Sequence, residues 1–112
     1  MPPSSTPTNS PPTVVQAAPQ GGTITAGGMF QQALPPNPAR KGGFLQNNSA
    51  TNVMKVYCGT TAAANSAGDG AAIQVPAGKF FNLNLGIPGF VYQGALQVDG
   101  TTSDAFATLD VT

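Results

Sequence analysis

Four aspartates and one cysteine are the side chains of this 112-residue chain that could carry acid–base or nucleophilic chemistry, because it contains neither histidine nor glutamate. Without histidine, neither a serine nor Cys58 can be given the imidazole base of the usual hydrolytic triad. Asp99 and Asp104 flank the segment GTTS, where they could form a carboxylate pair or supply hard oxygen ligands to calcium. Aspartate is also a common turn former, and no EF-hand spacing is present. We therefore interpret both as turn residues, with a calcium site as the alternative.

Cys58 is the only cysteine, which excludes a disulfide within the chain, and it ends the apolar-rich run 53–58. A buried structural thiol is therefore favoured over a nucleophile. The glycine-rich segments are interpreted as turns: GTTAAANSAG lacks the lysine of a phosphate-binding loop, and GGTITAGG is not followed by a predicted helix. The sequence thus predicts a protein that is not an enzyme and uses no cofactor or metal.

Charge limits the partners that the chain is expected to bind. Charged residues make up 7% of the chain, and four cations balance four anions. No surface is predicted that would attract nucleic acid or an anionic membrane, and near-zero net charge suits a subunit packed against other protein. Arg40 and Lys41, in NPARKGG, are interpreted as guards of an edge strand or as contacts to an acidic neighbour. The aromatic candidates for stacking on a sugar ring are Tyr57, Phe80, Phe90 and Tyr92.

Short strands are the elements that would position these side chains. After Gln20 the chain shows apolar runs of period two, separated by Gly, Pro and Asn at intervals of roughly ten residues, which is typical of an all-β sandwich or barrel. Helical periodicity is not evident. We predict an all-β fold, a jelly-roll-like antiparallel β-sandwich of about eight strands. The predicted strands are residues 22–26, 29–34, 43–48, 53–58, 71–75, 80–85, 94–99 and 104–111.

Alternation within these strands predicts which side chains face the core. The core-facing sets are Met54, Val56 and Cys58; Phe81, Leu83 and Leu85; Leu96 and Val98; and Ala105, Ala107, Leu109 and Val111. The last set turns Phe106 outward, as a rim residue or as a contact with a partner. Residues 47–52 supply a polar turn, so that the stretch 43–58 is predicted to be a β-hairpin.

The first 20 residues differ from the rest of the chain. They contain six prolines among Ser, Thr and Asn, which excludes a helix or a central strand and favours an extended arm. Val14 and Val15 are adjacent β-branched residues that a simple spacer does not need, so we favour an arm that orders on a partner over a flexible leader. The predicted organisation is an arm at residues 1–20 and a sandwich at 21–112. Because the N-terminus lacks the features of a signal peptide and no apolar run approaches about 20 residues, a cytoplasmic protein is expected.

Three segments follow one another in an order that resembles a known group of proteins: GGTITAGGMFQQALPPNPARKGGFLQNNSATNVMKVYCG, IQVPAGKFFNL and GALQVDGTTSDAFATLDV. They contain a short TIT strand, an NPxRxGxxxQN segment, an IxxPAG turn and a GAxxVxGxT ending. The pattern resembles small virion proteins of tailed bacteriophages. The positions that match are Asn37, Pro38, Arg40, Gly42, Gln46 and Asn47 in the second motif and Pro76, Ala77 and Gly78 in the turn. The resemblance implies that these positions define the fold of a β-sandwich subunit of decoration, cement or head-fibre-base type, without enzymatic activity or cofactor.

The sequence and the resemblance predict a virion structural protein: a capsid decoration or cement subunit, homo-oligomeric, that docks on the major capsid protein or another virion protein through its sandwich and arm. Its predicted location is the virion, assembled in the bacterial cytoplasm, and neither nucleic acid nor membrane is a predicted partner. The alternatives are a tail, baseplate or fibre adaptor and a glycan-binding host-attachment module that uses Tyr57 or Tyr92. The residues predicted to contact a partner are Val14, Val15, Arg40, Lys41, Phe90, Tyr92 and Phe106.

Overall fold

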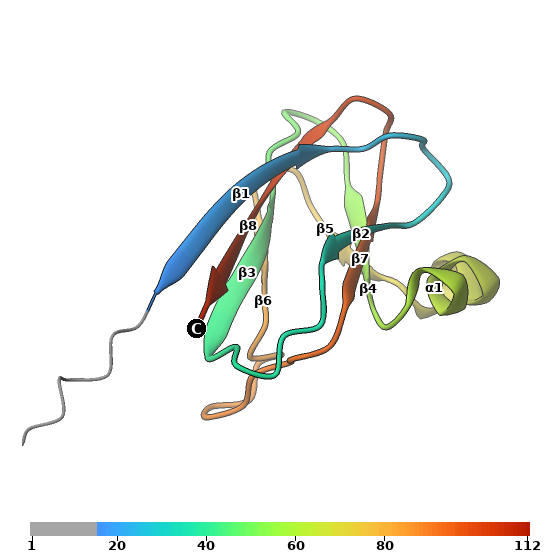
Figure 1. The fold of residues 1–112 in the computed structure, drawn as a ribbon. Coiled ribbons are helices and arrows are strands. Elements are labelled where there is room, and N and C mark those ends of the chain that lie inside the picture. Colours follow the sequence, from blue (N-terminus) through green and yellow to red (C-terminus); the bar gives the residue numbers. More distant parts are fainter. Residues whose placement is uncertain (1–15) are drawn as a thin grey trace, which may run out of the picture.

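Two four-stranded sheets pack face to face in the computed structural model, which describes residues 16–112 (Figure 1). Sheet A contains β1 (Ala17–Thr23), β8 (Ala105–Val111), β3 (Gly42–Asn47) and β6 (Phe80–Asn82), in that order. Sheet B contains β2 (Gln31–Leu34), β7 (Leu96–Asp99), β4 (Met54–Cys58) and β5 (Ile73–Val75), in that order. A short helix, α1 (Thr61–Ala67), and a 3-10 turn, η1 (Gly68–Ala71), connect β4 to β5. The predicted all-β sandwich is confirmed, with eight strands in the part of the chain that the structure describes.

The strand pairing is that of a jelly roll. β1 pairs with β8, β2 with β7, β3 with β6 and β4 with β5, all antiparallel, as in one long hairpin that has been wound up. Two further antiparallel pairs, β3 with β8 and β4 with β7, close the winding. Each sheet therefore has two edge strands, β1 and β6 in sheet A and β2 and β5 in sheet B.

The core lies between the two sheets. Its buried side chains are Ile24, Leu34, Leu45, Met54, Val56, Val75, Leu83, Leu96, Val98 and Phe106. The predicted inward positions of Met54, Val56, Leu83, Leu96 and Val98 are confirmed, and Cys58 and Phe81 pack against the same cluster. The inward position predicted for Leu85 is wrong, because β6 ends at Asn82 and Leu85 lies exposed in the loop that follows.

β8 faces the opposite way from the prediction. Phe106 is 6% exposed and belongs to the core, whereas Ala105, Ala107, Leu109 and Val111 lie on the outer face of sheet A. Gly22, which lies opposite Phe106 in β1, makes room for the ring, because a Cβ at this position would lie 2.6 Å from Phe106 Cζ. The outward position of Phe106, on which its predicted contact with a partner depended, is therefore wrong.

Residues 43–58 do not form a hairpin. β3 belongs to sheet A and β4 to sheet B, so the segment between them crosses from one sheet to the other. Asn47 holds this crossing: its Nδ2 donates to the carbonyls of Asn52 and Val75 at 2.8 and 2.9 Å, and its Oδ1 accepts from Ser49 N at 2.9 Å. A buried asparagine that satisfies three backbone groups stabilises a corner between sheets, where the polar turn by itself had favoured a hairpin.

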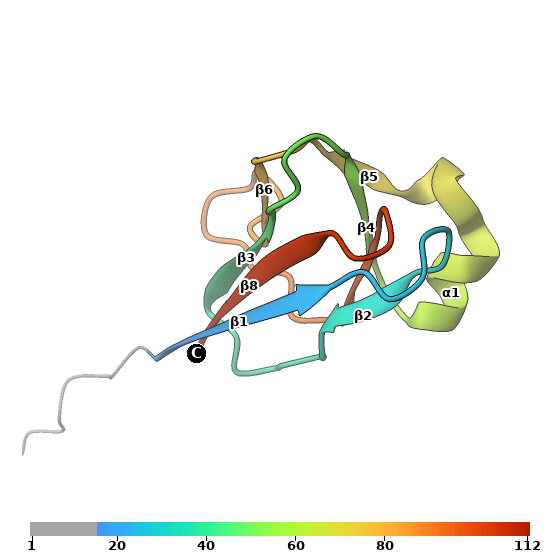
Figure 2. The same ribbon diagram turned by 90° about the horizontal axis from the view of Figure 1, so that it is seen from above.

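The helix α1 is not predicted from the sequence. Ala64 is the only buried residue of this helix, so TAAANSA shows no apolar stripe of helical period. The helix is defined by its ends: Thr60 Oγ1 accepts from Ala63 N at 3.1 Å, and Gly68 adopts a positive φ of 67° at the C-cap. In both Figure 1 and Figure 2, α1 lies outside sheet B, on the side away from sheet A.

The described chain is extended and paired from its first residue. Gln16 exchanges two backbone hydrogen bonds with Thr112, at 2.9 and 2.8 Å, and β1 begins at Ala17. Residues 17–20, which the predicted arm includes, thus belong to sheet A. Pro19 is compatible with this position because β1 is an edge strand and, by the alternation that starts at Gln16, the Pro19 nitrogen faces away from β8. Val14 and Val15 lie outside the described residues.

Candidate functional site

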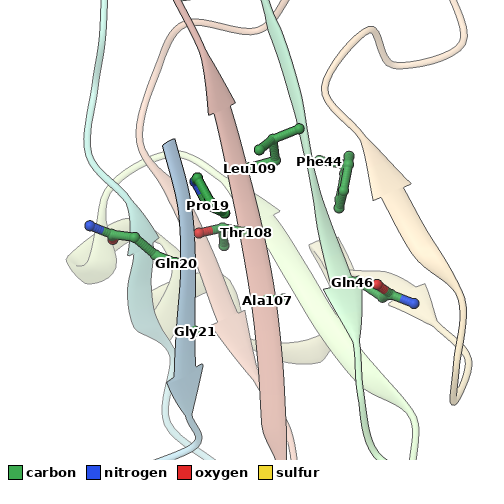
Figure 3. A pocket seen from close by; sticks show the side chains of 8 residues that line it. All are labelled: Pro19, Gln20, Gly21, Phe44, Gln46, Ala107, Thr108 and Leu109. Carbon is green, nitrogen blue, oxygen red and sulfur yellow. The ribbon is translucent and has the colours of Figure 1, made fainter. Parts of the chain in front are cut away.

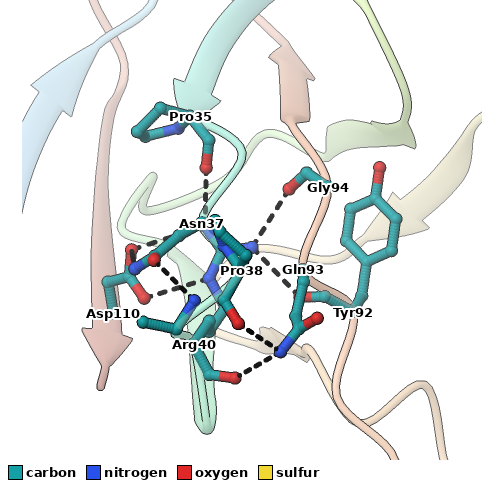
Figure 4. Close-up of polar contacts among 9 residues, drawn as sticks. Pro35, Asn37, Pro38, Arg40, Tyr92, Gln93, Gly94 and Asp110 are labelled. Atoms are coloured by element: carbon teal, nitrogen blue, oxygen red, sulfur yellow. Dashed lines mark hydrogen bonds and ion pairs between the residues drawn. The ribbon is translucent and has the colours of Figure 1, made fainter.

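A buried arginine joins three segments at one end of the sandwich (Figure 4). Arg40 is 1% exposed, and its Nε donates to Asp110 Oδ1 of β8 at 3.0 Å. Nη2 donates to Asp110 Oδ2 at 3.4 Å and to the Pro35 carbonyl at 2.7 Å, while Nη1 donates to the carbonyls of Tyr92 and Gly94, both at 3.0 Å. Every N–H group of the guanidinium therefore has an acceptor, which offsets the cost of burying its charge.

Two amide side chains extend this polar cluster. Asn37 Nδ2 donates to Asp110 Oδ2 at 3.3 Å, and Asn37 Oδ1 accepts from Ala39 N at 3.0 Å. Gln93 Nε2 donates to the carbonyls of Pro38 and Arg40 at 2.9 and 3.0 Å. The segment from Pro35 to Lys41 is thereby fastened both to β8 and to the chain that enters β7. Asn37 and Arg40 therefore help to hold the fold together at this end of the sandwich.

The two adjacent cations of the sequence have different environments. Arg40, predicted to guard an edge strand or to contact an acidic neighbour, is buried, and its acidic contact is Asp110 of the same chain. Lys41 is exposed, and its backbone N–H donates to the Val111 carbonyl at 2.6 Å. These two roles cannot be separated from the local sequence, because the carboxylate that pairs with Arg40 is 70 residues away.

Residues 83–95 form the loop that connects β6 to β7, at the lower end of the sandwich in Figure 1, and Arg40 bonds two of its carbonyls. Three large apolar side chains of this loop are exposed: Leu85 by 38%, Ile87 by 54% and Phe90 by 42%. We call these three residues the apolar tip. Phe90 is thus at the surface, as a predicted contact residue must be, and Leu85 and Ile87 are two further exposed apolar residues of the same loop.

Consecutive turns hold the apolar tip in one conformation. Their backbone hydrogen bonds run from Leu85 N to Asn82 O (3.1 Å), from Ile87 N to Asn84 O (2.9 Å) and from Phe90 N to Ile87 O (3.1 Å). Side-chain oxygens of Asn82 and Asn84 accept from the backbone N–H groups two residues further on, at 3.1 and 2.8 Å. Leu85 has a φ of 53°, a left-handed conformation that costs a non-glycine residue about 1–2 kcal/mol. An ordered loop that keeps a leucine strained and exposed indicates a functional surface.

The tyrosines predicted as sugar-stacking rings are engaged with the protein. Tyr57 packs on Phe30, with ring centroids 6.3 Å apart at 59°. The Tyr92 hydroxyl donates to the Ala95 carbonyl at 2.7 Å, and its ring packs against the core. Burial raises the pKa of Tyr92 above its ordinary value. Of the four aromatic candidates, Phe80 and Phe90 are the exposed ones.

The outer face of sheet A is a second exposed surface. β1 contributes Ala17, Pro19, Gly21 and Thr23, and β8 contributes Ala105, Ala107, Leu109 and Val111. β3 contributes Gly42, Phe44 and Gln46, and β6 contributes Phe80 and Asn82. A shallow hollow of about 360 Å³ lies on this face, between Pro19 and Gly21 on one side and Phe44 and Gln46 on the other, over Ala107 and Leu109 (Figure 3).

The two aspartates considered as calcium ligands, Asp99 and Asp104, accept hydrogen bonds within the protein. Asp99 Oδ1 accepts from Gly28 N at 3.0 Å and from Gly100 N at 2.7 Å, and Asp104 Oδ2 accepts from Asn52 Nδ2 at 3.0 Å. The bond from Gly100 lies within the segment 99–104, whereas the bonds from Gly28 and Asn52 join this segment to other parts of the chain. Cys58 is half-buried at the edge of the core, and this burial raises the pKa of its thiol. Within residues 16–112, no three acidic or cysteine side chains are grouped as metal ligands would be.

Comparisons of the chain with protein-family models, with curated proteins and with solved structures found no match. In the described range, no helix is long and apolar enough to cross a membrane. Of the residues predicted to contact a partner, Lys41 and Phe90 are at the surface, Tyr92 is partly buried, and Arg40 and Phe106 are buried. The segment LGIPGFVYQG signalled the apolar tip, because large apolar residues stood there among turn formers.

Proposed function

We propose that this protein is a non-enzymatic structural subunit of a bacteriophage particle, a decoration or cement protein that docks on the major capsid protein. The resemblance of its motifs to small phage virion proteins supports the proposal, and so does its fold, since jelly rolls are frequent in viral capsids. One fold serves many functions, so it is the surface that would make the contact that distinguishes a docking protein.

The observation that carries the proposal is the apolar tip. Leu85, Ile87 and Phe90 are exposed in one loop, and turns and the Arg40 cluster fix that loop before any partner is bound. A preordered loop loses little conformational entropy on docking. Burying the exposed half of each side chain in a pocket of a capsid protein stabilises the complex by roughly 1 kcal/mol per residue. On a shell, the same contact is repeated by every subunit.

The segment before Gln16 is the proposed second contact. Val14 and Val15 precede the first paired residue of β1, so an extension of that strand could add to a sheet edge of a neighbouring virion protein. The proposed arm is the one predicted from the sequence, but it ends at Val15 and not at Gln20, because the residues from Gln16 onward are paired with β8 or Thr112. A chain that begins at Gly21 would lack residues 17–20, more than half of β1. A loss of docking by such a chain could not be distinguished from a loss of folding.

Co-sedimentation with phage particles from the source culture tests the proposal. Tagged protein with Ile87→Asp is compared with the unchanged protein and with Ile73→Asp, which alters an isoleucine of similar exposure on β5. We expect Ile87→Asp to weaken docking by about tenfold, because a charge must then enter an apolar contact, and Ile73→Asp to dock normally. Equal docking of all three proteins would refute the role of the apolar tip.

A second series separates the arm from the tip and the head from the tail. A chain that begins at Gln16 keeps every pair of β1, and its thermal melting shows whether the sandwich is intact. If it melts normally but docks as well as the full chain, the arm makes no contact. Sedimentation with separated heads and tails distinguishes the decoration protein from a tail or baseplate adaptor, and no binding to either would overturn the virion proposal.

A further inference from the structure

The outer face of sheet A lacks the charge pattern of a sheet that faces water. Outward positions of a solvated antiparallel sheet are usually polar, yet here they are mainly Gly, Ala, Pro, Val, Leu and Phe, and none of the outward positions on the four strands carries a charge. Phe80, on the edge strand β6, is 60% exposed. A continuous apolar sheet face of this kind marks a surface that another protein covers.

The relief of this face is complementary to itself. On the β3–β6 side, Phe44 and Phe80 form a tilted aromatic pair with ring centroids 5.6 Å apart, and Phe80 stands out as a ridge. On the β1–β8 side, the small side chains of Gly21 and Ala107 leave the hollow of about 360 Å³. A two-fold axis that runs along the strands, between two facing copies, would place the ridge of each copy over the hollow of the other.

We propose that a second copy of this chain covers the face, so that two sheets A pack face to face as a symmetric dimer. This dimer goes beyond the proposed docking on a capsid, which uses the apolar tip and not this face. The absence of charge in this face favours a copy of itself as the occupant, because neither partner presents a charge that needs an opposite one. The net charge of zero also removes repulsion between copies.

The size of the face predicts the strength of the dimer. The four strands have seven, seven, six and three residues, and at about 4.8 Å by 3.4 Å per residue they give a footprint of roughly 375 Å² per copy. Two copies therefore bury roughly 750 Å², below the limit of about 1,000 Å² for a stable specific interface. The expected dimer is reversible and forms with rising protein concentration, and a crowded particle surface would favour it.

Sedimentation velocity of the full chain, from about 5 μM to about 500 μM, tests the dimer. We expect a shift from monomer to dimer within this range. Ala107→Arg, in the centre of the face, places two arginines in each symmetric dimer and should raise the dissociation constant by at least about tenfold. Ala62→Arg, the same substitution at an exposed position of α1 outside sheet B, is the matched control and should dimerise normally.

Two further variants make each outcome decisive. Phe80→Asp changes an exposed side chain at the rim, so it should weaken the dimer even if Ala107→Arg disturbs folding. Ile87→Asp in the apolar tip should leave the dimer unchanged while weakening docking on particles, which keeps the two proposals separate. The proposal is overturned if the protein is monomeric throughout the range. It is equally overturned if folded Ala107→Arg and Phe80→Asp dimerise normally, or if only Ile87→Asp abolishes the dimer.

Discussion

The outer faces of the two sheets differ, although each sheet has four antiparallel strands. Sheet B is covered: Gln97 points outward from β7, yet it is 0% exposed, because it accepts from the Thr61 hydroxyl of α1 at 2.7 Å and donates to the Gly59 carbonyl at 2.9 Å. Phe30 extends the cover, held through its backbone N–H by Asn65 of α1 at 2.7 Å. Among residues 16–112, no such layer covers sheet A, and Ala107 and Leu109 of β8 line an open hollow.

The difference shows that the polarity of a strand's outward residues depends on what covers the sheet. On β7 the outward residues, Gln97 and Asp99, are polar, and groups of the same chain satisfy them. On β8 the outward side chains are apolar and can neither donate nor accept hydrogen bonds, so a surface that covers them must also be apolar. One sheet therefore carries its cover within the chain, and for the other we infer that a second copy supplies it.

The stability of sheet A should depend more on the Arg40 cluster, which contacts β8 through Asp110, than on any cover of its outer face. We expect Arg40→Ala to lower the free energy of unfolding by about 3–5 kcal/mol, because Asp110 then keeps a largely buried charge without its partner. Urea denaturation measures the loss. Lys41→Ala, at the exposed neighbour, should stay within about 0.5 kcal/mol of the unchanged protein. Equal small losses would mean that the cluster does not support the sheet.

A charge placed on each outer face tests the comparison directly. Gln97→Arg puts a cation beneath α1 and removes two hydrogen bonds, so we expect a loss of about 3 kcal/mol in the free energy of unfolding. Ala107→Arg puts the same cation on the open face of sheet A, where the expected loss for the monomer is below about 1 kcal/mol. Thermal melting at low protein concentration compares the two. Similar losses would contradict the difference in cover.

Loosening the cover of sheet B should have a smaller effect. Thr60→Ala removes the cap of α1, and we expect a loss of about 1 kcal/mol together with faster hydrogen exchange in residues 61–67. Thr101→Ala, at an exposed turn position, is the matched control. If exchange in α1 is as slow in the Thr60 variant as in the control, the helix is held by its packing on sheet B and not by its cap.

The pH dependence of stability should be the smallest effect. Burial raises the pKa of Cys58 above its ordinary value of 9.0, and the pKa of Tyr92 above 10.0. The folded protein therefore keeps these protons at a pH at which the unfolded chain loses them, so their contribution to stability is complete below about pH 9 and is lost as the pH rises further. Urea denaturation between about pH 7 and 11 measures this decline. A protein with both Cys58→Ala and Tyr92→Phe should show less of it, whereas stability that rises over this range would contradict the assignment.

The fold class could be predicted because its signals are local. Alternation, together with Gly and Pro at the turns, placed seven strands within about three residues of their bounds and identified Met54, Val56, Leu83, Leu96 and Val98 as core. The first predicted strand, residues 22–26, overlaps β1 by only two residues, because the prolines before it favoured an arm. The helix α1 was not predicted, because its capping residues also occur in turns and a single buried alanine gives no helical periodicity. Of the apolar tip, the turns were predictable from LGIPGFVYQG, but Leu85 was assigned to a strand, because alternation continues past the residue at which pairing with β3 ends.

By itself, the sequence determined the strands, the turns and the lack of charge, since each depends on residues that are neighbours in the chain. Tertiary structure alone decided which way β8 faces, because both sides of this strand carry apolar residues that could pack in the core. The side with Phe106 faces inward since Gly22, opposite it in β1, leaves space for the ring. It also decided that β3 and β4 belong to different sheets and that Arg40 is buried. Those outcomes depend on Asn47 reaching Val75 and on Arg40 reaching Asp110, contacts between residues that are close only after the chain has been wound up.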